Sequence, residues 1–259
     1  MTGEIEVRAE GGIKWLKLLG HGERNAMTQY MMQRLGQEFR QVSPDIRAIV
    51  ISGGGNGWFC GGGHVGKVDE MSIEEIRTIC RDFIELHRAL RRVEVPVIAK
   101  VDGHVAANGV ALVAGCDLAV ATKDIEFAMP EINVGLIPLL ATVVLSRHIL
   151  PKTAFELAYF GRKFSADAAR SYGLLNQVLP DKASLDAKLK EWTTDLAGRS
   201  RAALATGRAT FIAMMYEGVD RDMELAAGNL TALLMSDEVR AVLRKTAGHA
   251  YADRPPEKH

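Results

Sequence analysis

The chain has 259 residues, 47% of them hydrophobic and 25% charged, a composition typical of a globular protein that buries a large core. Its 32 basic and 32 acidic residues leave a formal net charge of zero, which argues against a nucleic-acid partner. The three cysteines have no CxxC spacing, and no apolar run reaches the ~20 residues of a membrane span. Early acidic residues argue against a secretory signal. We therefore expect a soluble cytoplasmic protein with reduced thiols and no membrane partner.

The first part of the chain predicts strands, one helix and a loop rich in glycine. Gly11-Gly12 separates two short strands, and Ser43-Pro44 ends the helix that follows them. The glycines after the third strand indicate positive-φ turns or a backbone that closely approaches another group. The expected ranges are strands at 5–7, 13–18 and 46–52, a helix at 28–42 and a glycine-rich segment at 53–63.

A long amphipathic helix is expected next, over residues 72–93. Ser72 and Glu75 have the spacing of a capping box, and the apolar residues that follow recur on one helical face. Pro96 closes the segment, and an apolar strand at 97–101 leads from it into the centre of the chain.

The central stretch, residues 101–138, carries the candidate chemistry. It contains the turn Ala107-Asn108-Gly109, a helix of small residues, and a carboxylate, Glu131, just after the strand at 125–128. Apolar neighbours would desolvate Glu131 and raise its pKa towards the range of a general acid or base. A glutamate that merely caps the following turn is the alternative, and these residues alone leave both open.

The remaining chain predicts short helices and one more strand. The helices are expected at 139–150, 153–160, 166–171, 185–196, 202–216, 221–235 and 237–249, and the strand at 175–179. We predict an α/β core over residues 1–195 and a helical region over residues 196–259. The apolar surface of these last helices favours either an oligomer contact or packing within the chain.

Several common sites are disfavoured. Residues 61–66 match GxGxxG, but the preceding strand ends at Ser52, too early for a dinucleotide-binding turn. No P-loop, no GxSxG elbow and no metal-ligand spacing occurs, so no metal site is expected. His64 and His104 flank the two glycine-rich turns, although such histidines are more often packed or solvated.

The two glycine-rich turns gain meaning when they are taken together. Each can present a backbone N–H, and two such donors converging on one oxygen form an oxyanion hole. With Glu131 opposite, this arrangement suits proton removal next to a thioester carbonyl, because the enolate oxygen is stabilised as its charge develops.

Three motifs resemble those of the crotonase (enoyl-CoA hydratase/isomerase) superfamily. They are Phe59-Cys60-Gly61-Gly62-Gly63, the segment from Val101-Asp102-Gly103 to Cys116-Asp117-Leu118, and Met129-Pro130-Glu131-Ile132 with Val134-Gly135. The resemblance runs from Ile13 to about Lys245. It implies an α/β spiral of repeated β-β-α units with a C-terminal helical region, an acyl-CoA substrate, no cofactor beyond the substrate's coenzyme A, and a homotrimer or dimer of trimers.

The resemblance also implies roles for single residues. The oxyanion donors would be the N–H groups of Gly63 and Asn108, and Glu131 would be the acid/base. The residues implied for coenzyme A binding are Arg24, Ala26, Gly61, Val65 and Lys245.

Two departures from the family pattern guide the expected reaction. Hydratases of the family use a second glutamate, where this chain has Ala111, and the family usually has glycine where this chain has Asn108. The apolar run Leu136-Ile137-Pro138 also resembles members with one carboxylate. We therefore expect double-bond isomerisation of an enoyl-CoA by Glu131. The alternatives are hydration, hydrolysis or decarboxylation with His64 or His104 as the missing group, or acyl-CoA binding without turnover.

Overall fold

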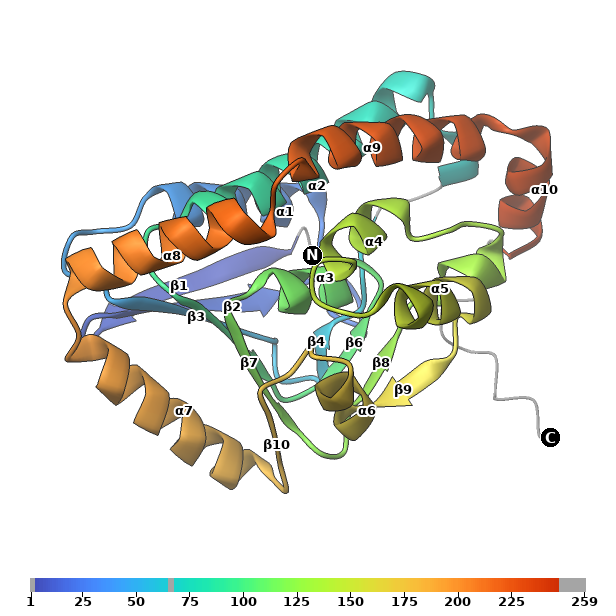
Figure 1. Cartoon of the computed structure of the whole chain (residues 1–259). Helices are drawn as coiled ribbons and strands as arrows, with labels where there is room; N and C mark the ends of the chain where they lie inside the picture. Colours follow the sequence, from blue (N-terminus) through green and yellow to red (C-terminus); the bar gives the residue numbers. More distant parts are fainter. Residues whose placement is uncertain (1–2, 65–67, 247–259) are drawn as a thin grey trace.

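The computed structural model describes residues 3–64 and 68–246, in which two β-sheets are surrounded by helices (Figure 1). The larger sheet has the strand order β1-β2-β3-β5-β7-β10 and the smaller one β4-β6-β8-β9. Pairing is parallel except between β1 and β2 and between β8 and β9. The strands are β1 (Glu4–Glu10), β2 (Ile13–Leu19), β3 (Ala48–Ser52), β4 (Trp58–Cys60), β5 (Val97–Val101), β6 (His104–Ala106), β7 (Leu118–Thr122), β8 (Glu126–Ala128), β9 (Lys163–Ser165) and β10 (Gln177–Leu179).

Ten α-helices and two short 3₁₀ helices complete the described part of the chain. None of these helices is long and apolar enough to cross a membrane. The α-helices are α1 (Gln29–Arg40), α2 (Ile73–Arg92), α3 (Asn108–Gly115), α4 (Leu139–Leu145), α5 (Pro151–Phe160), α6 (Ala166–Ser171), α7 (Lys182–Ala197), α8 (Arg201–Met215), α9 (Val219–Met235) and α10 (Asp237–Thr246), and the 3₁₀ helices are η1 (Val68–Glu70) and η2 (Pro130–Val134).

The predicted spiral of β-β-α units is confirmed by the element order. Four times in succession, two strands are followed by an α-helix, from β1-β2-α1 to β7-β8-α4. In the last three units, the first strand joins the larger sheet and the second joins the smaller one. The smaller sheet therefore places the ends of β4, β6 and β8 side by side, although these segments are far apart in the sequence.

Alternating side chains of the buried strands serve two separate cores. In β3, Ile49 and Ile51 belong to the main core, with helices such as α1 and α2. Ala48 and Val50 point to the other face, where Leu189 of α7 covers them. Both faces of the sheet are therefore covered at β3, which pairs in parallel with both neighbours, and this explains its nearly continuous apolar sequence.

The expected long helix is confirmed as α2, including its start. Ser72 and Glu75 form the capping box, in which the backbone N–H of Ser72 donates to Glu75 Oε2 at 2.8 Å and that of Glu75 donates to Ser72 Oγ at 3.3 Å. The expected helix at 139–150 is wrong in its length, because α4 ends at Leu145 and α5 begins at Pro151. Proline is well suited to that first helical position, where no backbone N–H is needed.

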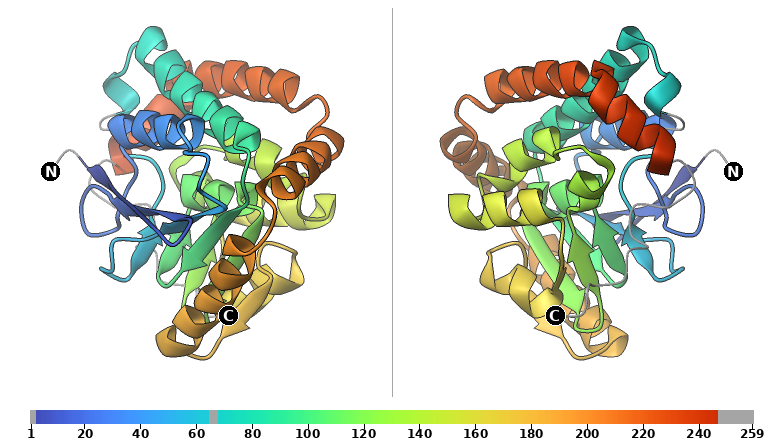
Figure 2. Two further views of the ribbon diagram at one scale, coloured as in Figure 1. Left: turned by 90° about the vertical axis from the view of Figure 1, so that its left-hand side faces the viewer. Right: turned by 90° about the vertical axis from the view of Figure 1, so that its right-hand side faces the viewer.

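The helices α8 to α10 pack against the rest of the chain through buried polar contacts as well as apolar ones. Arg208 of α8 donates to the backbone carbonyls of Leu90 and Val93 at the end of α2, and its Nε lies 2.8 Å from Asp117. Two opposite views, each turned by 90° from that of Figure 1, show α9 running beside α2 (Figure 2). The division at residue 195 stays a prediction.

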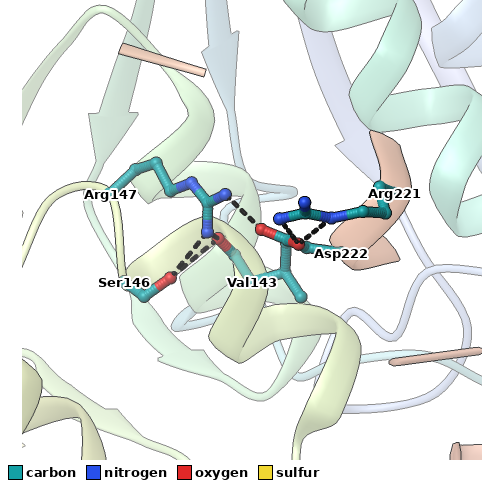
Figure 3. Close-up of polar contacts among 5 residues, drawn as sticks. All are labelled: Val143, Ser146, Arg147, Arg221 and Asp222. Carbon is teal, nitrogen blue, oxygen red and sulfur yellow. Dashed lines mark hydrogen bonds and ion pairs between the residues drawn. The ribbon is translucent and has the colours of Figure 1, made fainter. Parts of the chain in front are cut away.

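The start of α9 is held by arginines. Asp222 accepts from Arg147, which follows α4, at 2.5 Å, and from its neighbour Arg221 at 3.0 Å (Figure 3). Arg147 also donates to the carbonyl of Val143 and to Ser146, which fixes the end of α4. These contacts fasten α9 to α4, and both helices form walls of the cavity described next.

Candidate active site

The site lies where three neighbouring parallel strands of the smaller sheet end. The glycine turn follows β4, the Ala107 turn follows β6, and Glu131 in η2 follows β8. The Ala107 N–H donates to the carbonyl of Ala128 at 3.0 Å, which joins the second and third of these ends. Because carboxyl ends of parallel strands share one edge, segments separated in sequence meet there.

The glycine turn after β4 is fixed by a short bridge to Met27. The Met27 N–H donates to the carbonyl of Gly62, and the His64 N–H donates to the carbonyl of Met27, both at 2.8 Å. In a parallel bridge of this kind the central residue, Gly63, directs its own N–H away from its partner. Gly63 therefore has an N–H that this bridge does not use, and the residue lines the cavity.

The second turn is a sharp bend from β6 into α3. Ala107 has φ 51° and ψ −123°, a conformation that residues with a Cβ rarely adopt. Asn108 is the first helical residue, so its N–H has no partner within the helix. The next position, residue 109, must be glycine, because a Cβ there would lie 2.5 Å from the carbonyl oxygen of Cys60.

The two turns touch each other. A Cβ placed on Gly62 would lie 2.9 Å from the Cβ of Ala107 and 3.9 Å from the backbone nitrogen of Asn108. Gly62 has φ +104°, so both its conformation and this close approach require glycine. The structure thus brings Gly63 and Asn108 to one cavity, and their role as an oxyanion hole stays a prediction.

The cavity beside these turns has a volume of about 130 Å³ and walls that are mainly hydrocarbon. Its polar side chains are those of Cys80, Asn108 and Glu131. The apolar walls come from the segment before α2, from α2 itself, from α4 and from α9. The residues are Val68, Met71, Ile76, Ile79, Phe83, Ala107, Leu136, Ile137, Pro138, Leu139, Leu140, Ala141, Leu230 and Leu234, with Gly61, Gly62 and Gly63 at the turn.

Glu131 is a buried carboxylate with an unpaired oxygen. The residue is 8% exposed, and Oε2 has no hydrogen-bond partner among the described residues. Burial raises the pKa of Glu131 to about 7, although a hydrogen bond from its own backbone N–H acts in the opposite direction. A carboxyl group with this pKa can take up and release a proton near neutral pH.

The loop before α1 lies against the glycine turn through a residue that sequence reasoning missed. Asn25 is buried, has φ 54°, and donates from its side chain to the carbonyl of Phe59 at 2.7 Å. Its neighbour Arg24 packs on Gly61, where a Cβ would lie 2.6 Å from the Arg24 carbonyl oxygen. An asparagine shortly after Gly20-His21-Gly22 was the available signal, because asparagine tolerates positive φ.

The other residues implied for coenzyme A binding are Ala26, Lys245 and Val65. Ala26 forms an antiparallel β-bridge with His21. The His21 N–H donates to the Ala26 carbonyl at 2.7 Å, and the Ala26 N–H donates to the His21 carbonyl at 2.9 Å. Lys245 is exposed on α10, which packs against η1 and η2. Val65 lies outside the described residues. The structure therefore joins Arg24, Ala26 and Gly61 near one turn, and it places Lys245 on a helix that packs against η1 and η2.

Neither histidine considered as a second catalytic group lines the cavity. The ring of His64 stacks on that of His21, with centroids 3.9 Å apart. His104 Nδ1 accepts from the backbone N–H of Glu126 at 3.1 Å. Ala111, where hydratases of the resembled superfamily carry a glutamate, is fully buried.

A family profile described as enoyl-CoA hydratase/isomerase matches residues 8–256. The chain belongs to this family. Among curated relatives, the human mitochondrial enoyl-CoA hydratase domain-containing protein 3 is 32% identical over 230 residues, which cover 88% of this chain and 74% of that protein. The human mitochondrial Delta(3,5)-Delta(2,4)-dienoyl-CoA isomerase is 28% identical over 240 residues, covering 86% of this chain and 73% of the isomerase.

Solved structures of the enoyl-CoA hydratase/isomerase family have the same fold. An enoyl-CoA hydratase from Mycobacterium avium is 30% identical with a TM-score of 0.83, covering 94% of this chain and 95% of its own. Human enoyl coenzyme A hydratase domain-containing protein 3 has a TM-score of 0.77 at 29% identity, covering 93% of this chain and 97% of its own. The superfamily and fold inferred from the three motifs are thereby confirmed.

The predicted cytoplasmic location is contradicted by these family members. Relatives from several vertebrates are named mitochondrial, and an isomerase from Arabidopsis thaliana is named peroxisomal. These names point to an organelle instead. The prediction was wrong because the composition and the three free, buried cysteines indicate only a reducing interior, which does not distinguish one compartment from another.

Proposed function

We propose that the protein isomerises the double bond of an enoyl-CoA thioester, with Glu131 as its single acid/base. The observation that supports this most directly is the unpaired, buried Glu131 oxygen on a hydrocarbon cavity next to two turns with available N–H groups. The dienoyl-CoA isomerases among its relatives favour the same reaction class.

In the proposed reaction one proton moves between two carbons of the acyl chain. The thioester oxygen of a 3-enoyl group accepts hydrogen bonds from the N–H groups of Gly63 and Asn108. The Glu131 carboxylate takes a proton from carbon 2, and the electron pair moves into a dienolate whose charge rests on that oxygen. Glu131 then returns the proton to carbon 4, which leaves a 2-enoyl thioester. No water takes part.

Coenzyme A itself is proposed to bind at the glycine turn. Arg24 and Gly61 lie in contact there, and Arg24 also approaches the Trp58 ring, with 5.9 Å between its guanidinium carbon and the ring centroid. Ala26, Val65 and Lys245 remain proposed contributors. Beyond this coenzyme A moiety of the substrate, no cofactor is proposed.

Hydration finds less support than isomerisation. Addition of water needs a group that holds the water in addition to one that handles the proton on carbon 2. His64 and His104 were the candidates, and both lie off the cavity. We treat hydration, hydrolysis and decarboxylation as outcomes that the following assay can reveal.

The test is turnover of paired 3-enoyl and 2-enoyl thioesters by the wild type and by Glu131→Gln. We expect wild-type isomerisation to fall about 10²- to 10⁴-fold in the variant, while thioester binding changes little. Glu126→Gln is the matched control, because Glu126 lies on β8 but is exposed and paired with Lys163. Isomerisation that survives Glu131→Gln refutes the proposed base, and binding without turnover of any thioester favours a non-catalytic acyl-CoA-binding role.

Self-association as a homotrimer or dimer of trimers is also proposed. Helix α8 exposes Phe211, Met214 and Met215, and α5 exposes Phe155, Tyr159 and Phe160. Exposed apolar groups of this size on two helices favour a protein contact over a solvated surface. Light scattering should give a mass of three or six chains.

A further inference from the structure

The helices α2 and α9, which both line the cavity, run antiparallel to each other. Near the end of α2, Arg91 pairs with Asp220 at the start of α9, at 2.5 Å. Further back on α2, the thiol of Cys80 forms a hydrogen bond with Thr231 of α9. Residue numbers therefore fall along α2 as they rise along α9, so the start of α2 lies beside the end of α9.

The glycine turn lies beside the middle of α2. This turn is bridged to Met27, and two residues later Gln29, the first residue of α1, donates to Asp82 Oδ2 at 3.0 Å. The residues of α2 that line the cavity run from Phe83 back to Ile76, about 10 Å along the helix. The cavity therefore extends from the level of the glycine turn towards the start of α2.

Helix α10 covers the cavity at the start of α2. Arg240 of α10 donates from Nη2 to the carbonyl of Met71, just before α2, at 2.6 Å. It also donates from Nε to the carbonyl of Leu234, near the end of α9, at 3.1 Å. Met71 and Leu234 both line the cavity. One guanidinium thus ties together two cavity walls that come from distant parts of the chain.

A third wall at this end of the cavity also rests on α10. Leu136 lines the cavity, and the residue before it, Gly135, lies so close to Val242 of α10 that a Cβ on Gly135 would be 3.3 Å from Val242 Cγ1. Val239 of α10 is buried in the main core. None of the described residues of α10 lines the cavity itself. The helix therefore supports three walls from behind.

We propose that α10, held by Arg240, closes the acyl cavity at the start of α2 and thereby selects short acyl chains. This inference rests on the proposed acyl-thioester site. A longer chain has to push Met71 and Leu234 apart, which breaks the hydrogen bonds that join them through Arg240. Hydrogen bonds from a charged guanidinium are stronger than those between neutral groups, so this closure resists the longer chain. Arg240 is a positioning residue, because it acts through the walls.

The test compares the binding of hexanoyl-CoA and dodecanoyl-CoA, two saturated thioesters without a double bond to isomerise. Calorimetry on the wild type and on Arg240→Met gives the ratio of the two dissociation constants. We expect the wild type to bind dodecanoyl-CoA at least about tenfold more weakly, because a hydrophobic pocket discriminates by about that factor against one ill-fitting methylene. In Arg240→Met the two should bind about equally. The ratio cancels any effect of α10 on coenzyme A itself.

Two further variants control the comparison. Arg244→Met removes an exposed arginine one turn further along α10 and should keep the wild-type ratio. Val242→Ala removes methyl groups that pack on Gly135 and should lower the ratio as Arg240→Met does. It takes the place of Arg240→Met if that variant does not fold.

The outcomes separate this inference from the proposed function. Equal or tighter binding of dodecanoyl-CoA by the wild type, or an unchanged ratio in folded Arg240→Met, overturns the closure by α10 and leaves the acyl-thioester site intact. A wild-type protein that binds neither thioester overturns the proposed function and this inference with it.

Discussion

Replacing Glu131 with glutamine should make the protein more stable at alkaline pH while removing its activity. The pKa of Glu131 is raised in the folded state from 4.5 to about 7 by burial. Below pH 4.5 the carboxyl group is neutral in the folded and the unfolded chain, so it has no effect on the free energy of unfolding. As the pH rises to 7, the unfolded chain releases its proton first, and stability is lost.

The size of this effect follows from the pKa shift. A shift of one unit corresponds to about 1.4 kcal/mol, so ionised Glu131 destabilises the fold by about 3 kcal/mol above pH 7. Glutamine has nearly the same shape and no charge. Glu131→Gln should therefore raise the free energy of unfolding by about 3 kcal/mol at pH 8 and have little effect at pH 4.5.

Urea unfolding of both proteins at pH 8 and pH 4.5 measures this difference. With a slope of about 2 kcal/mol per molar urea, the midpoint at pH 8 should rise by more than 1 M. Glu126→Gln, at the exposed first residue of β8, controls for the loss of one carboxylate. If Glu131→Gln stabilises equally at both pH values, or not at all, the desolvated carboxylate is not the cause and its raised pKa is refuted.

Two further predictions concern stability. Burial lowers the pKa of His87 to about 3, with a smaller contribution from Arg91, so stability should fall by about 1.4 kcal/mol per pH unit as the pH drops below 6.5. His87→Leu should reduce that slope in urea titrations at pH 7, 6 and 5, and parallel curves for the two proteins would contradict it. Ala107→Gly should leave stability within about 1 kcal/mol of wild type, because it relieves the strain of a positive φ. Ala114→Gly, in the regular part of α3, should cost about 1 kcal/mol, and an equal loss in both variants would show that the bend is unstrained.

The parts of the fold with strong periodicity were predictable from the sequence. The capping box at Ser72 located the start of α2, and the apolar runs located β3 and β5. The three-residue strands β4, β6 and β9 were missed, because three residues are too few to show an alternating pattern. Their pairing partners lie far away in the sequence, so their existence depends on tertiary structure.

The residues of the candidate site were predictable from the sequence, but the strands that bring them together were not. The glycine turn, Asn108 and Glu131 were recognisable as residues, and they line one cavity. Their common origin at the ends of β4, β6 and β8 was hidden, because two of these strands were unrecognised. Asn25 was missed because it does not line this cavity and acts by holding the backbone of Phe59.

The buried guanidinium of Arg208 has a consequence for the order in which the chain is completed during synthesis. It donates to carbonyls at the end of α2 and to Asp117, which precedes it by 91 residues. Because the ribosome delivers the N-terminal part first, these acceptors emerge long before their donor. A nascent chain that contains both sheets still has unpaired carbonyls at the end of α2, and only the arrival of α8 completes that part of the core.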